Sequence, residues 1–185
     1  MPSLKAIYVR NPKCASNSIQ KYLTDAGGAD ARKRQEYPLP ILVNSRYFVF
    51  SFVRNPWERL LSAWLSKIRE GSFLGLADHE LTFVELVSCL ENLRADGKFD
   101  SVNMHLRPQT TILSIAELDF VGRVESLEQD LHRLSDDLGI ARVPLLRLHA
   151  FRADLVSQEL YTPELVDRVA RLYAEDITAY GYEFS

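Results

Sequence analysis

Residues 47–62 read Tyr-Phe-Val-Phe-Ser-Phe-Val-Arg-Asn-Pro-Trp-Glu-Arg-Leu-Leu-Ser. The first seven are mainly aromatic or β-branched, which is typical of a buried strand. Asn55 then suits a helix N-cap, Pro56 the first helical position and Glu58 the third, where it would complete a capping box. The stretch therefore predicts a buried strand that turns directly into a helix, which we expect to reach residue 70.

The same alternation continues on both sides of this stretch. Further strands are expected at 6–9 and 118–124, and helices at 16–23, 82–93, 126–138 and from 162 onward. Alternating strands and helices favour a parallel β-sheet flanked by helices, an α/β fold. The length of 185 residues suits a single domain over 1–185. The polar stretch 94–110 shows neither the helical nor the strand periodicity of apolar residues, so we expect a long loop there. Long loops in compact domains are typically functional or disordered.

The loop between the first strand and its helix has the features of an anion site. Residues 11–18 read Asn-Pro-Lys-Cys-Ala-Ser-Asn-Ser, and small side chains let the backbone approach a ligand closely. A helix start adds N–H groups and the positive end of the helix dipole, while Lys13 adds a charge and Ser16 and Ser18 add hydroxyls. The loop resembles a P-loop in these properties but lacks its glycine-lysine pattern. A solvated lysine and a plain Ser16 N-cap explain the loop equally well.

A second candidate anion site lies where the strand of residues 47–53 ends. Arg54 follows that strand, and the ends of parallel strands border the crevice where such sheets bind ligands. Its planar guanidinium fits a phosphate, and Ser62 on the next helix offers a hydroxyl. A surface arginine and an exposed helical serine are the simpler explanation of this pair taken alone.

Together the two segments resemble the donor site of sulfotransferases that use 3′-phosphoadenosine 5′-phosphosulfate (PAPS). Lys13 with its small-residue loop is similar to the 5′-phosphosulfate loop of that family, and Arg54 followed eight positions later by Ser62 is similar to its 3′-phosphate motif. The His-x-x-Pro segment 105–108, the segment 120–127 and the aromatic final helix resemble the carbohydrate (Golgi-type, sulfotransferase family 2) branch. These segments follow the family's order over nearly the whole chain, which would make it a soluble short form of that branch.

The resemblance implies PAPS as co-substrate and a set of site residues. Those assigned to the nucleotide are Lys13, Cys14, Ala15, Ser16, Asn17, Ser18, Arg54, Ser62 and Arg152. Lys13 is also expected to act in catalysis by stabilising the leaving nucleotide, and Cys14 is expected to be a small loop residue and no nucleophile. For Arg152 a surface salt bridge is an equal alternative. The expected base is His105, since a neutral imidazole accepts a proton near pH 7, and a structural histidine bonded within its loop is the alternative.

Composition and charge disfavour several classes of protein. Hydrophobic residues make up 46% of the chain and charged residues 25%, an ordinary globular balance. The net charge of −3 disfavours a nucleic acid polymer as partner. Cys14 and Cys89 are too few for a disulfide scaffold or a zinc cluster, and no acidic metal motif is visible, so no metal is expected. With no signal-peptide pattern and no membrane-spanning run, a cytoplasmic protein is expected.

Two other functions stay open. A catalytically inactive nucleotide-binding module would keep the donor site without transfer, and the short chain is compatible with it. A P-loop-like small-molecule kinase would need ATP and magnesium, and the missing glycine-lysine pattern disfavours it. The expected acceptor is a hydroxyl of a carbohydrate or another small molecule, and carbohydrate is favoured by the resemblance alone.

Overall fold

A computed structural model describes residues 6–27, 47–68, 81–114, 117–146 and 160–184. The chain divides into two compact units, unit 1 (Met1–Arg54 with Leu113–Ala150) and unit 2 (Asn55–Ile112 with Phe151–Ser185). The single domain over 1–185 stays a prediction. No helix in the described ranges is both long enough and apolar enough to span a membrane.

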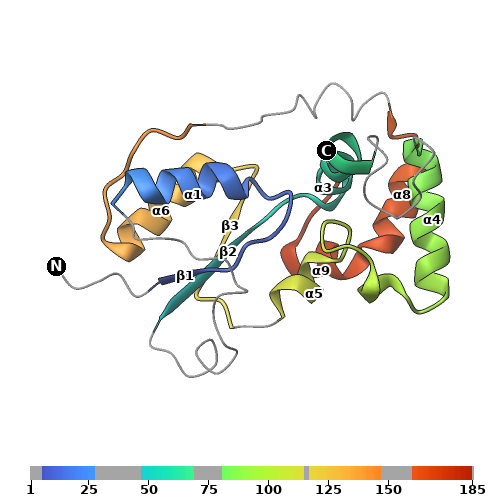
Figure 1. Cartoon of the computed structure of the whole chain (residues 1–185), viewed down its shortest axis with the longest axis horizontal. Helices are drawn as coiled ribbons and strands as arrows, with labels where there is room; N and C mark the ends of the chain where they lie inside the picture. Colours follow the sequence, from blue (N-terminus) through green and yellow to red (C-terminus); the bar gives the residue numbers. More distant parts are fainter. Residues whose placement is uncertain (1–5, 28–46, 69–80, 115–116, 147–159, 185) are drawn as a thin grey trace. The chain divides into compact units, whose positions relative to one another are not determined.

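Unit 1 is built on a parallel sheet of three strands in its described part (Figure 1). The strands are β1 (Ala6–Tyr8), β2 (Phe48–Val53) and β3 (Phe120–Arg123), with β2 in the centre. Tyr8 pairs with Phe50, and Phe50 pairs with Phe120, so the three strands run together towards one carboxyl edge. The expected α/β fold with a parallel sheet is confirmed.

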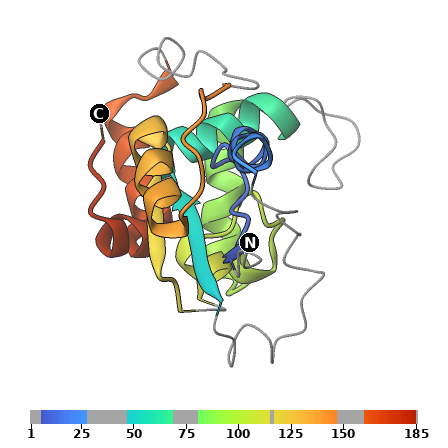
Figure 2. The same ribbon diagram turned by 90° about the vertical axis from the view of Figure 1, so that its left-hand side faces the viewer.

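Helices α1 (Ser16–Asp25) and α6 (Leu127–Leu138) pack on this sheet through one aromatic core, and Figure 2 shows α1 almost end-on. The members of the core are Tyr8, Ile19, Tyr22, Leu23, Ala26, Phe50, Phe52, Phe120, Leu127, Leu131 and Leu134. The rings of Tyr8 and Phe50 stack with their centroids 5.3 Å apart, and Phe52 meets Phe120 at 6.0 Å. Side chains therefore join the three strands in addition to the backbone ladder.

The regular elements of unit 2 are all helical in its described part. They are α3 (Pro56–Ala63), η2 (Trp64–Ile68), α4 (Phe83–Ala95), η3 (Phe99–Ser101), α5 (Gln109–Leu113) at the unit boundary, α8 (Pro163–Leu172) and α9 (Ala174–Tyr180). Helices α4 and α8 lie side by side (Figure 1). The side chain of Asn55 accepts from the N–H of Trp57, as its position before Pro56 predicts. Thr82 forms a full capping box with Glu85 at the start of α4.

Three sequence expectations for unit 2 are wrong in detail. The helix that starts at Pro56 becomes the π-helix η2 at Trp64 and does not continue as an α-helix. The loop expected over 94–110 is shorter, because α4 runs to Ala95 and α5 begins at Gln109, and it contains the short helix η3. The final helix is interrupted at Tyr173, between α8 and α9.

A buried carboxylate explains why α5 forms where the sequence shows no helical period. Asp176 in α9 is 0% exposed and accepts from the backbone N–H groups of Gln109 and Thr110, each at 2.8 Å. Both N–H groups belong to the first turn of α5, where the helix itself offers them no acceptor. The negative charge of Asp176 also suits that end of the helix dipole. The cap comes from 66 residues along the chain, so no local pattern announces it.

Ser126 stands at the N-cap of α6, as expected, but its hydroxyl does not form the usual capping hydrogen bond. It donates to a carboxylate oxygen of Asp130 at 2.8 Å and does not accept from the helix backbone. The same carboxylate oxygen accepts from the N–H of Arg123 at 2.8 Å. Asp130 therefore fixes the turn by which β3 passes into α6.

Candidate functional site: the loop after β1, Arg54 and the His105 turn

The loop between β1 and α1 has a backbone that ordinary residues rarely adopt. Lys13 and Ala15 have left-handed φ angles of 68° and 52°, and they are the only residues other than glycine with positive φ in the described ranges. The N–H of Cys14 donates to the carbonyl of Asn11 at 3.3 Å, which closes a turn with Pro12 and Lys13 at its centre. A proline followed by a positive φ is the arrangement of a type II turn, which usually takes glycine at that second position. Backbone strain of this kind clusters at active sites, ligand clamps and switch regions.

Hydrogen bonds inside the loop hold this shape. The hydroxyl of Ser16 donates to the carbonyl of Asn11 at 3.0 Å and accepts from the hydroxyl of Tyr8 at 3.3 Å. Burial raises the pKa of Tyr8, so its hydroxyl keeps the proton that it donates. The thiol of Cys14 is fully buried and donates to the carbonyl of Pro12 at 3.7 Å. Cys14 thus serves as a small interior residue of the loop in this structure.

The start of α1 differs from the plain serine cap considered from the sequence. The N-cap is Ala15, whose side chain has no oxygen to accept from the helix start, and Ser16 is the first helical residue. The explanation of Ser16 as a plain N-cap is therefore wrong. Asn17 is exposed and accepts from Arg10 at 3.2 Å, whereas Ser18 is buried. The first N–H groups of α1 lie at a positively polarised helix end beside the turn that carries a lysine.

Arg54 lies at the same edge of the sheet as this loop. The loop follows β1 and Arg54 follows β2, which are adjacent parallel strands. The loop is tied directly to β2, since the Asn11 side-chain amide donates to the carbonyl of Phe52 at 3.1 Å. Arg54 itself is half-buried. Within unit 1 the structure therefore brings the Lys13 loop and Arg54 together at the carboxyl edge, where parallel sheets bind ligands.

The other expected site residues lie in unit 2 or outside the described ranges. Ser62 is a half-buried residue of α3, and its carbonyl accepts from the hydroxyl of Ser66 at 2.7 Å, where the α-helix passes into η2. π-Helical turns of this kind are frequent at functional sites. His105 lies in a turn between η3 and α5. Arg152 lies outside the described residues, so its role stays a prediction.

The imidazole of His105 has a defined tautomer. Its Nδ1 lies 2.9 Å from Oδ1 of Asn103, and the same oxygen accepts from the backbone N–H of His105 at 3.1 Å. Because an amide oxygen only accepts, Nδ1 carries the ring proton and Nε2 is the basic nitrogen. This contact is the local hydrogen bond of a structural histidine, and it is also the arrangement that orients a general base.

Sequence reasoning missed the residues that hold the His105 turn. Arg59 in α3 donates to the carbonyls of Arg107 at 2.8 Å and Met104 at 3.3 Å. Tyr173 donates to the carbonyl of Leu106 at 2.8 Å. The one available signal was an arginine three positions before Ser62 and directly before the apolar Leu60 and Leu61.

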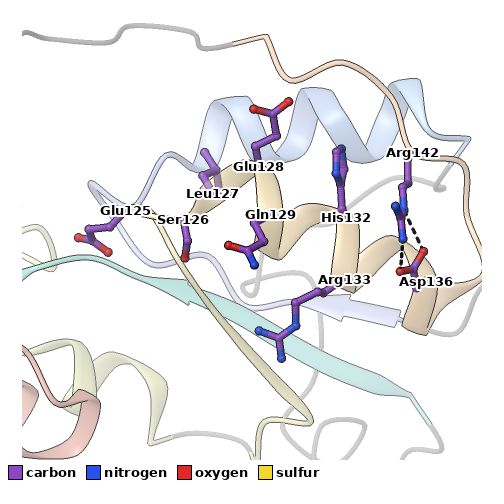
Figure 3. A pocket seen from close by; sticks show the side chains of 9 residues that line it. All are labelled: Glu125, Ser126, Leu127, Glu128, Gln129, His132, Arg133, Asp136 and Arg142. Atoms are coloured by element: carbon purple, nitrogen blue, oxygen red, sulfur yellow. Dashed lines mark hydrogen bonds and ion pairs between the residues drawn. The ribbon is translucent and has the colours of Figure 1, made fainter.

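An open depression of about 570 Å³ lies along α6 in unit 1 (Figure 3). It is lined by Glu125, Ser126, Leu127, Glu128, Gln129, His132, Arg133, Asp136 and Arg142. Asp136 and Arg142 pair across it, with Arg142 Nε donating at 3.0 Å. Its three carboxylates outnumber its two guanidiniums, so it suits a polyanionic nucleotide less well than the loop after β1. None of the expected site residues lines it.

A model of the Sulfotransferase family matches residues 2–183 of the chain. The match spans both units and includes the Lys13 loop, Arg54, Ser62 and His105. No curated protein and no solved structure matches the chain.

Proposed function

The chain belongs to the sulfotransferase family, whose activity is sulfuryl transfer, and we propose that it takes the sulfuryl group from PAPS and passes it to a hydroxyl group of an acceptor. The observation that carries this proposal is the pair of cationic segments at one sheet edge of unit 1. A strained lysine-containing turn leads into the start of α1, and Arg54 follows the adjacent strand. PAPS carries two separate phosphate groups, so it needs two such segments where a simple anion needs one.

The loop of residues 13–18 binds the 5′-phosphosulfate in this proposal. Successive backbone N–H groups in a turn with left-handed residues form a concave donor surface, and the N-terminus of α1 adds the positive end of its dipole. The ammonium of Lys13 compensates the negative charge that grows on the 5′-phosphate as the sulfuryl group leaves. The Ser16 hydroxyl donates to the carbonyl of Asn11, which supports a loop-shaping role for Ser16 alongside any contact with phosphate.

The 3′-phosphate is bound by Arg54 and Ser62. A guanidinium offers two parallel N–H donors to phosphate oxygens, and a helical hydroxyl adds a third donor. This contact distinguishes PAPS from ATP, which has no 3′-phosphate. Arg152 is a further proposed phosphate contact, and Arg152→Ala tests it directly.

The chemical step is an in-line displacement at sulfur. Nε2 of His105 takes the proton of the acceptor hydroxyl while the acceptor oxygen bonds to sulfur. The bond between sulfur and the 5′-phosphate oxygen breaks, and adenosine 3′,5′-bisphosphate leaves with the electron pair. The tautomer fixed by Asn103 supports this role, because it makes Nε2 the basic nitrogen.

The acceptor is proposed to be a carbohydrate or another small hydroxylated molecule. This choice follows the resemblance of the His-x-x-Pro segment to the carbohydrate branch. Two cysteines in the chain suit a reducing compartment, and we propose the cytoplasm on that ground.

A thermal-shift titration in EDTA separates this function from its rivals. Adenosine 3′,5′-bisphosphate is expected to raise the melting temperature without any metal, and ATP with magnesium, in a parallel sample, is expected to raise it less. A larger shift with ATP and magnesium would favour a kinase. Tight bisphosphate binding combined with no transfer of ³⁵S from labelled PAPS to any of a panel of sugars and phenols would favour a binding module.

A further inference from the structure

A guanidinium is buried in α3. Arg59 is 2% exposed and is among the largest fully buried side chains in the described part of the protein. A buried charge is costly unless hydrogen bonds replace the lost water. Two of its nitrogens donate to backbone carbonyls, Nη1 to Arg107 at 2.8 Å and Nη2 to Met104 at 3.3 Å. Arg59 therefore joins α3 to a turn that lies more than 40 residues further along the chain.

The turn held in this way carries His105. The carbonyls of Met104 and Arg107 stand on either side of it, and between them the carbonyl of Leu106 accepts from the hydroxyl of Tyr173. Burial raises the pKa of Tyr173, so the hydroxyl remains a donor. Two buried side chains from elsewhere in unit 2 thus hold the backbone on both sides of the histidine.

The imidazole depends on the same turn. Asn103, which fixes the ring tautomer through Nδ1, lies two residues before His105. The N–H of Leu106 donates to the carbonyl of Asn103 at 2.8 Å, so the turn closes around the histidine. A change in the backbone of this turn would therefore move the ring and its hydrogen-bond partner together.

The helix that carries Arg59 also carries Ser62. Positions three apart in a helix lie on neighbouring parts of one face. Helix α3 has only eight residues and is fixed at its start by the Asn55 cap, so the two side chains belong to one short rigid segment.

We propose that Arg59 is a positioning residue that locks the turn of residues 103–107, and with it His105, to the helix that carries Ser62. The group that takes the acceptor proton and a group that binds the donor's 3′-phosphate then share one support within unit 2. This inference rests on the proposed function for the roles of His105 and Ser62, whereas the mechanical link itself rests on the hydrogen bonds of Arg59.

The mechanical link is tested with Arg59→Met, which keeps the length of the side chain and removes its donors. Hydrogen exchange at the Leu106 amide is expected to become about tenfold faster or more, because the turn opens more easily. The ¹⁵N signals of His105, assigned with His105→Gln, are expected to shift from the Nδ1-protonated tautomer towards a mixture. Unchanged exchange and an unchanged tautomer in Arg59→Met would overturn the proposal.

Two further variants control this experiment. Arg94→Met removes another arginine of unit 2 that donates to a backbone carbonyl, that of Leu172 at 2.7 Å, and is expected to leave the His105 signals unchanged. Arg59→Lys keeps the charge with a single nitrogen and is expected to give an intermediate tautomer mixture. If Arg59→Met does not fold, Arg59→Lys decides: wild-type exchange and tautomer in that variant would overturn the proposal.

Calorimetry with adenosine 3′,5′-bisphosphate separates positioning from direct phosphate binding. Arg59→Met is expected to bind the nucleotide within about threefold of wild type, a difference below 1 kcal/mol by the tenfold-per-1.4 kcal/mol relation. A loss as large as that of Arg54→Ala would make Arg59 a phosphate ligand and overturn the proposal. If wild type itself does not bind the nucleotide, the proposed donor site is wrong, while exchange and tautomer still decide the link between Arg59 and the His105 turn.

Discussion

Lys13 has a left-handed backbone, which costs a residue with a side chain about 1–2 kcal/mol relative to glycine. Glycine is the usual residue at such positions, so a lysine there points to a requirement for the side chain. Ala15, two residues later, has the same backbone form without a functional side chain. The two positions therefore separate the effect of backbone shape from the effect of the ammonium group.

Replacing Lys13 with glycine removes the charge and keeps the backbone favourable. We expect Lys13→Gly to remain folded, with unchanged or slightly higher stability, and to lose about 10²–10³-fold in the rate of sulfuryl transfer. The reason is that the ammonium compensates charge that develops only as the nucleotide leaves. Single-turnover transfer of ³⁵S from PAPS measures the rate, and thermal unfolding measures the stability.

Ala15→Gly is the matched control for that variant. It relieves the same backbone strain without removing a charged group, so transfer is expected to stay within about threefold of wild type. Full activity in Lys13→Gly would remove Lys13 from the mechanism. Equal losses in both variants would assign the effect to the shape of the loop.

At the scale of secondary-structure elements, the sheet of unit 1 depends on a close approach between β2 and β3. A Cβ atom at Gly122 would lie 2.3 Å from the ring of Phe52, which is itself 0% exposed. The ring packs over the glycine of the neighbouring strand, and a buried ring has little room to shift. Glycine is required at this position for space and not for its backbone angles.

Gly122→Ala is accordingly expected to destabilise the protein by about 1–3 kcal/mol through overpacking. Urea unfolding measures the loss. Val121→Ala, at the exposed neighbouring position, is expected to stay within about 0.5 kcal/mol of wild type. The double variant Gly122→Ala, Phe52→Leu is expected to be more stable than the sum of its two single changes predicts. If the free-energy costs of the two single changes simply add in the double variant, the close contact between Phe52 and Gly122 is contradicted.

The pair of helices α4 and α8 is joined by an ion pair with a pH-dependent contribution. Arg168 donates to both carboxylate oxygens of Glu91, with a shortest distance of 2.6 Å, and to the hydroxyl of Ser88 at 2.8 Å. The hydrogen bond from Arg168 lowers the pKa of Glu91 below its ordinary value of 4.5. The stabilisation is therefore present above pH 4.5 and is lost as the pH falls through the lower pKa of the folded state.

Glu91→Gln is expected to cost about 0.5–1 kcal/mol near neutral pH, since the pair is bidentate but partly exposed. The difference from wild type should shrink as the pH falls below 4.5 and should disappear once the carboxylate is protonated in the folded state as well. Urea unfolding over a pH series from neutral to acid measures it. Glu175→Gln breaks a longer contact of 3.4 Å to Arg94, with 60% of the Glu175 side chain exposed, and is expected to change nothing measurable. A constant cost of Glu91→Gln across this range would contradict the ion pair.

At the scale of the whole molecule, local patterns predicted the elements that form from local signals. The parallel strands and the capped starts at Asn55 and Thr82 were predicted because hydrophobic period and capping residues are read over a few positions. The structure of 94–110 was not predicted, because the side chains that hydrogen-bond to its backbone come from helices distant in the sequence. Asp176 starts α5, and Tyr173 holds the turn before it.

The candidate site likewise has features that local sequence patterns predicted and features that they did not. The Lys13 loop and Arg54 could be placed at one sheet edge, because both follow parallel strands that the sequence marks clearly. The left-handed backbone angles could not be predicted, because neither Lys13 nor Ala15 is a residue that favours them. The hydrogen bonds from Arg59 to the His105 turn could not be predicted either, because a charged residue on a helix is normally solvated.

A nucleotide titration of wild type and Arg54→Ala tests the central claim, a separate site for the 3′-phosphate, most directly. Isothermal calorimetry compares adenosine 3′,5′-bisphosphate with 5′-AMP, which lacks the 3′-phosphate. We predict that wild type binds the bisphosphate much more tightly than AMP. Arg54→Ala should lose about 1.5–3 kcal/mol of binding energy for the bisphosphate and almost none for AMP. Equal affinity of wild type for the two nucleotides, or equal losses for both in Arg54→Ala, would contradict it.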